Sequence, residues 1–138
     1  MPVSPDLAER TLRFAIRASK LGATLRAPFA LQSILRQFVD AGTAVGSNYR
    51  AAGRARSYRE FTARMGVVAE EADESEYWLD VLGGALDLSS TDAEKLLAEA
   101  RELRGIFIRA HTTAEQRLRD LERQKNHRPR ARLPSGTE

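Results

Sequence analysis

Residues 31–53 have the sequence LQSILRQFVDAGTAVGSNYRAAG, which carries the clearest periodicity in the chain. Apolar or small residues recur there every three or four positions, at Leu31, Ile34, Leu35, Phe38, Val39, Gly42, Val45, Tyr49 and Ala52. This spacing places them on one face of an α-helix. The stretch therefore predicts an amphipathic helix that buries one stripe and ends at Gly53.

The segments on either side predict two more helices. Ser4, Pro5 and Asp6 are typical of a helix start, and that helix should end before Pro28. Ser57 and Glu60 form a capping box that predicts the start of another helix. Its core positions would be Phe61, Met65, Val68, Ala72, Ser75, Leu79 and Leu82, and the Gly83-Gly84 pair would end it.

A second capping box, Thr91 with Glu94, predicts a fourth helix that runs to about Arg123. Its apolar stripe is Leu96, Ala100, Leu103, Phe107, Ala110, Ala114 and Leu121. No alternation typical of a β-strand is present. The expected fold is an all-α, antiparallel up-down-up-down four-helix bundle over residues 1–124, followed by a basic tail at 125–138.

Composition narrows the class of protein. A chain of 138 residues is the size of one domain, and the absence of cysteine excludes disulfides and thiolate metal sites. The sequence shows neither a signal peptide nor an apolar run long enough to cross a bilayer. We therefore expect a cytoplasmic protein without a membrane partner.

The charges are segregated along the chain. Residues 1–64 carry a net charge of +7, residues 65–102 carry −9, and residues 103–138 carry +5. Such segregation is typical either of a nucleic-acid-binding face or of surfaces that pair within or between subunits. Arginine makes up 19 of the 22 basic residues, which suits phosphate binding but is also expected from a GC-rich genome.

The densest acidic run comprises Glu70, Glu71, Asp73, Glu74, Glu76 and Asp80. It is either a solvated face or a contact with arginines of another helix or another subunit.

The densest basic cluster surrounds the predicted turn before Ser57 and comprises Arg50, Arg54, Arg56, Arg59 and Arg64. Tyr49 and Tyr58 lie near it, and arginine combined with aromatic side chains is typical of a surface that binds single-stranded nucleic acid.

Catalytic and metal sites gain no support from the sequence. A di-metal bundle needs Glu-x-x-His pairs, but the only two histidines are His111, on an ordinary helical stretch, and His127, in the tail. We expect no catalytic residues, no metal and no cofactor, and we expect His111 to lie at the surface or at the edge of the core.

Tyr77, Trp78 and Val81 fall off the inward stripe, where aromatic residues are typical of an oligomer interface.

Several of these residues occur together in a known family. They are Gly46-Ser47-Asn48, Ala51-Ala52-Gly53, Ser57 with Glu60-Phe61, and Tyr77-Trp78-Leu79. Over residues 7–120 the chain resembles the four-helix-bundle proteins encoded in bacterial 23S rRNA intervening sequences. It departs from their pattern at Tyr49-Arg50-Ala51-Ala52, where an apolar residue, Ala and Glu are more usual, so its basic cluster is stronger.

The resemblance implies a bacterial four-helix bundle that forms a ring-shaped homopentamer. A related branch, the accessory proteins of diversity-generating retroelements, binds nucleic acid and a reverse transcriptase, which implies nucleic acid and another protein as partners. The resulting hypothesis is a non-catalytic homo-oligomeric scaffold or adaptor that binds RNA or DNA through a basic surface. The alternative is an oligomeric protein-interaction module with no nucleic-acid role.

Overall fold

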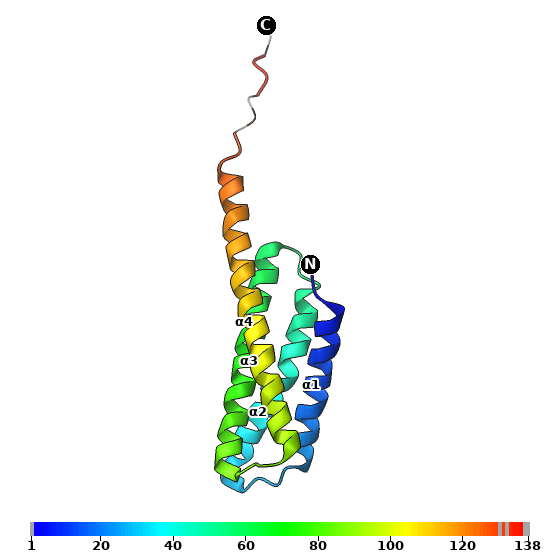
Figure 1. Cartoon of the computed structure of the whole chain (residues 1–138). Coiled ribbons are helices and arrows are strands. Elements are labelled where there is room, and N and C mark those ends of the chain that lie inside the picture. The colour runs from blue at the N-terminus through cyan, green and yellow to red at the C-terminus, as the bar shows by residue number, and fades with distance from the viewer. Residues whose placement is uncertain (1, 130, 132, 137–138) are drawn as a thin grey trace.

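The computed structural model describes residues 2–129, 131 and 133–136. Its four helices are α1 (Pro5–Thr24), α2 (Phe29–Ala52), α3 (Tyr58–Leu86) and α4 (Thr91–Asn126). Each helix runs antiparallel to the one before it, and α4 extends well beyond the turn that joins α2 to α3 (Figure 1). The all-α up-down-up-down bundle predicted from the sequence is confirmed.

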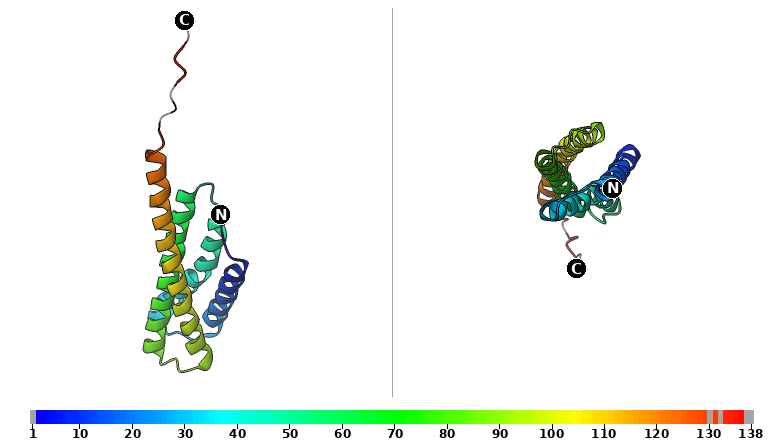
Figure 2. Two further views of the ribbon diagram at one scale, coloured as in Figure 1. Left: turned by 45° about the horizontal axis from the view of Figure 1, so that its top comes forward. Right: turned by 90° about the horizontal axis from the view of Figure 1, so that it is seen from below.

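The four helices do not enclose the core evenly. Contacts are most extensive between α2 and α3 and between α3 and α4, and they are sparsest between α1 and α4, which diverge when the bundle is seen along its axis (Figure 2). Arg10 of α1 bridges this seam, because its guanidinium pairs with Glu99 at 2.7 Å and also with Glu102, both on α4. The hydrogen bond to Glu99 is the main cause of a raised pKa for Arg10.

The starts of α1 and α3 are confirmed. The Leu7 N–H donates to the Ser4 hydroxyl at 3.3 Å, and the Glu60 N–H donates to the Ser57 hydroxyl at 3.0 Å. The Glu60 carboxylate accepts from the Arg56 N–H at 3.0 Å, so both halves of the predicted cap are in use, although the carboxylate reaches one residue further back than in the standard capping box.

Two helix ends were predicted wrongly. The cap of α4 is Ser90, whose hydroxyl accepts from the Ala93 N–H at 3.3 Å, and Thr91 is the first helical residue. Consecutive hydroxyl residues can all cap a helix, and starting at Thr91 buries Ala93, which is 5% exposed. Helix α3 continues through the glycine pair to Leu86 and ends at Asp87, whose φ of 54° is left-handed, a conformation that Asp tolerates better than most residues.

The core follows the predicted stripes closely. All seven core positions predicted for α3 are buried, and they pack with Phe14, Phe38, Leu103 and Phe107 of the other helices. The α1–α2 contact depends on small residues: a Cβ added at Gly46 would lie 3.0 Å from the Thr11 hydroxyl, and one added at Gly42 would lie 2.9 Å from the Ala18 Cβ. A Cβ at Gly46 would also lie 3.3 Å from the Thr11 carbonyl carbon, so the two backbones approach closely at this point.

Candidate nucleic-acid interface

The fold brings two basic segments that are distant in sequence to one end of the bundle. Because α4 runs antiparallel to α3, its C-terminal part lies beside the N-terminus of α3. Two contacts fix this arrangement: Arg59 forms an ion pair with Glu122, and the Arg117 guanidinium lies 5.7 Å from the centre of the Tyr58 ring. We call this region, residues 50–60 with 115–128, the basic end. It holds nine basic and four acidic side chains.

The five arginines predicted as a binding patch divide into two groups. Arg50, Arg54 and Arg56 are exposed, and within the residues that the structure describes no carboxylate lies at ion-pair distance from them. Arg59 is engaged with Glu122, and Arg64 donates to the Asn48 side-chain oxygen at 3.3 Å. The charge available to a partner is therefore concentrated at the α2–α3 turn.

Tyr49 was wrongly predicted to be a stacking group. It is 3% exposed, its ring centre lies 5.2 Å from that of Phe107, and its hydroxyl accepts from the Ser4 N–H at 2.6 Å. Tyr49 continues the buried stripe of α2, and this periodicity was the better guide to its position. Tyr58, by contrast, is half-buried and faces a groove.

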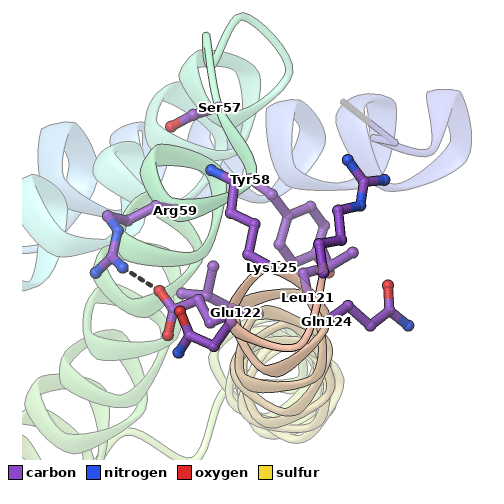
Figure 3. A pocket seen from close by; sticks show the side chains of 10 residues that line it. Ser57, Tyr58, Arg59, Leu121, Glu122, Gln124 and Lys125 are labelled. Atoms are coloured by element: carbon purple, nitrogen blue, oxygen red, sulfur yellow. Dashed lines mark hydrogen bonds and ion pairs between the residues drawn. The ribbon is translucent and has the colours of Figure 1, made fainter. Parts of the chain in front are cut away.

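This groove lies between the start of α3 and the overhanging part of α4, and we call it the end groove (Figure 3). Its volume is about 770 Å³, and the residues that matter most in its lining are Tyr58, Arg59, Leu118, Leu121, Lys125 and Arg128. Sequence periodicity placed Leu121 in the core, but it is 37% exposed because no helix lies opposite this part of α4. The groove was not predicted from the sequence.

The acidic run of α3 is largely paired within the chain. Arg104 of α4 lies 2.8 Å from Asp73 and 3.5 Å from Glu76, and Arg101 lies 3.6 Å from Glu76 and 3.4 Å from Asp80. Asp73, Glu76 and Asp80 therefore contact arginines of another helix, which is one of the interpretations offered for this run. Pairing with another subunit remains a prediction for the others.

The other three acids of the run are Glu70, Glu71 and Glu74, and among the described residues none of them has a cation at ion-pair distance. Partial burial raises the pKa of Glu71, and the nearby carboxylates of Glu74, Glu70 and Asp40 raise it further. This part of the run is therefore a locus of like-charge repulsion rather than of pairing.

Exposed apolar side chains occur on two outer faces. Tyr77 is 59% exposed and packs edge-on against Trp78, while Trp78 and Val81 are half-buried and Trp78 also contacts the core. On α1, Leu12 and Ile16 are 58% and 46% exposed. The α1 pair was not predicted from the sequence, although both residues fall off the stripe of Thr11, Phe14 and Ala18 that this helix buries.

His111 lies at the edge of the core, as predicted. It is half-buried against Gly66, where an added Cβ would lie 3.0 Å from the imidazole Nε2, and its Nδ1 lies 3.6 Å from a Glu115 oxygen. In the described part of the chain, no three His, Asp or Glu side chains are grouped as metal ligands would be. Among the same residues, no helix combines the length and apolar character that crossing a membrane requires.

The fold and the site define an all-α four-helix bundle with one strongly basic end. Neither a protein-family model nor a curated protein matches the sequence. Among solved structures, a protein of unknown function from the S23 ribosomal protein family of Bacteroides thetaiotaomicron is similar in fold, with a TM-score of 0.64 and 25% sequence identity. The match covers 75% of this chain and 96% of that one.

Proposed function

We propose that this chain is a non-catalytic, homo-oligomeric four-helix-bundle scaffold that binds RNA or DNA through its basic end. The observation that carries the proposal is the convergence of the α2–α3 turn and the C-terminal part of α4, which the sequence presents as separate basic segments. Arg50, Arg54 and Arg56 extend from this end with no carboxylate of the described chain at ion-pair distance. Unpaired guanidinium groups are suited to bidentate contacts with phosphate.

Self-association is the second part of the proposal. Tyr77, Trp78 and Val81 on α3, with Leu12 and Ile16 on α1, offer apolar surface outside the core, and oligomer interfaces are typically anchored by such groups. The resemblance to proteins encoded in 23S rRNA intervening sequences favours a pentamer, and the S23-family structure supports the helical fold that this resemblance implies. Light scattering should then give five times the chain mass of 15.4 kDa.

A titration of the purified protein against structured RNA and single-stranded DNA at two salt concentrations tests the binding function. Because each phosphate contact releases counterions, the affinity for either ligand should fall steeply with salt. Complete absence of salt-dependent binding would contradict the proposal. The alternative function, an oligomeric protein-interaction module, predicts that result together with an intact oligomer, and the exposed apolar groups of α1 and α3 are the observation that favours it.

A further inference from the structure

The end groove exists because α4 is longer than the bundle it packs against. The inward stripe of α4 is fully buried at Ala114, which is 3% exposed, but it becomes half-buried at Leu118 and is 37% exposed at Leu121. Figure 3 shows the side chains of Tyr58 and Leu121 converging on the space between the two helices. Most of the exposed lining is therefore apolar, although the surrounding surface is highly charged.

The Tyr58 ring supplies an aromatic surface to this groove. It is half-buried, and its centre lies 5.5 Å from that of Phe61, which holds it against α3. Arg117 lies over the ring, and Tyr58 packs partly against the core, but Tyr58 also lines the groove, so part of its side chain is exposed there. An aromatic side chain beside aliphatic ones is the kind of surface on which an unpaired base stacks.

The rim of the groove is positively charged. Lys125 and Arg128 line it from α4 and the residues that follow, and Arg59 lines it from α3. Arg59 is neutralised by Glu122, which leaves Lys125 and Arg128 as cations for an anionic ligand. The volume of about 770 Å³ lies within the range of about 300–1,000 Å³ that is typical of small-ligand sites.

We propose that the end groove holds an unpaired nucleobase of single-stranded RNA or DNA. The base stacks on Tyr58 and Leu121, and Lys125 and Arg128 contact the phosphates that flank it. A base-paired duplex cannot use the groove in this way, because its bases are stacked on one another. This inference rests on the proposed function, and it adds a preference for single strands that the exposed arginines alone would not create.

The first test of base stacking changes the ligand and leaves the protein unaltered. A short single strand is compared with an abasic strand that has the same number of phosphates, using fluorescence anisotropy at one salt concentration. The phosphate contacts are the same for both, so the difference reports the bases alone. Because stacking of one base contributes about 1–3 kcal/mol, the wild type should prefer the base-bearing strand by roughly 5- to 150-fold.

Variants then locate the preference in the groove. Tyr58→Leu should abolish the preference for the base-bearing strand, whereas Tyr58→Phe should keep it because the ring remains. Phe29→Leu is the matched control, since it removes a 90% exposed aromatic residue at the start of α2, outside the groove. If Tyr58→Leu fails to fold, Leu121→Gln provides the same test at a more exposed position.

Each remaining outcome overturns a defined part of the account. Equal affinity of the wild type for both strands, or a preference that survives in folded Tyr58→Leu and Leu121→Gln, contradicts the groove while leaving the proposed function intact. A drop in oligomer mass in these variants would show that the groove is a subunit contact instead. Full competition by AMP at the concentration at which the strand binds would assign the groove to free nucleotides. Failure of the wild type to bind either strand would overturn the proposed function itself.

Discussion

The acidic run of α3 and the arginines of the α2–α3 turn are both dense in charge, but they differ in where their counter-ions lie. Asp73, Glu76 and Asp80 are paired with Arg101 and Arg104 of the neighbouring helix. Arg50, Arg54 and Arg56 at the turn have no such partner among the described residues of the chain. Charge density in a sequence therefore does not by itself identify a candidate binding surface, and the charge that the fold leaves unpaired is the better guide.

Reversing the charge of the turn should have the largest effect. Arg50→Glu, Arg54→Glu and Arg56→Glu together replace three cations by anions. The loss of three phosphate contacts alone corresponds to roughly 100-fold in affinity for a single strand at about 0.1 M salt, and repulsion adds to this. Anisotropy should therefore show a loss of more than about 100-fold. Thermal unfolding should change little, because exposed substitutions cost within about 0.5 kcal/mol each. Unchanged binding by this variant would contradict the proposal that the unpaired arginines of the turn contact the nucleic acid.

Tyr77 is an exposed aromatic residue on α3, the helix that carries the acidic run. Tyr77→Ala should weaken self-association by roughly 30-fold, since a central aromatic anchor contributes about 2 kcal/mol or more to an interface. Light scattering over a dilution series measures this change. Phe29→Ala, which alters a 90% exposed aromatic residue at the start of α2, should leave the mass unchanged. Weaker self-association of Phe29→Ala, with that of Tyr77→Ala unchanged, would place the interface elsewhere.

Removing the counter-ions of the acidic run should lower stability but not binding. Arg101→Ala with Arg104→Ala breaks the four ion pairs that join the acidic run to α4, each of which is partly exposed. We expect a loss of roughly 1–2 kcal/mol in the free energy of unfolding, reduced at high salt by screening. Denaturant titrations at two salt concentrations measure it. A loss of nucleic-acid binding in the folded variant would show that these arginines are not committed to α3.

The smallest effect concerns Glu71, whose pKa is raised by burial and by its acidic neighbours. A raised carboxyl pKa means that the folded state holds the proton more tightly than the unfolded state. The wild type therefore gains stability as the pH falls through the folded pKa towards the ordinary value of 4.5. Glu71→Gln should be more stable than the wild type at neutral pH, by about 0.5 kcal/mol or less, and should lose this advantage in acid. Denaturant titrations at both pH values test the sign.

Periodicity predicted the bundle because burial in a helix pair depends on which residues share a face, and this is local information. The core stripe of α3 from Phe61 to Leu82 is the clearest example. Helix ends were harder, because Ser89, Ser90 and Thr91 all offer a capping hydroxyl and the packing of Ala93 decides among them.

The candidate site was predictable only in part. Its arginines were visible as a cluster, but whether each finds a partner depends on residues some 60 positions away, as with Arg59 and Glu122. The end groove depends on the length of α4 relative to α3. No local pattern encodes that difference, so Leu121 was predicted to be buried like the rest of its stripe.

The most direct test of the central claim is the salt dependence of single-strand binding by two matched variants. One carries Arg50→Ala, Arg54→Ala and Arg56→Ala, and the other carries Arg26→Ala, Arg36→Ala and Lys95→Ala, which removes the same charge from exposed positions at the opposite end. The slope of log K against log salt should be lower in magnitude by about 2 for the first variant and unchanged for the second. Equal slopes for the two variants would show that binding follows net charge alone, and the basic end would not be the interface.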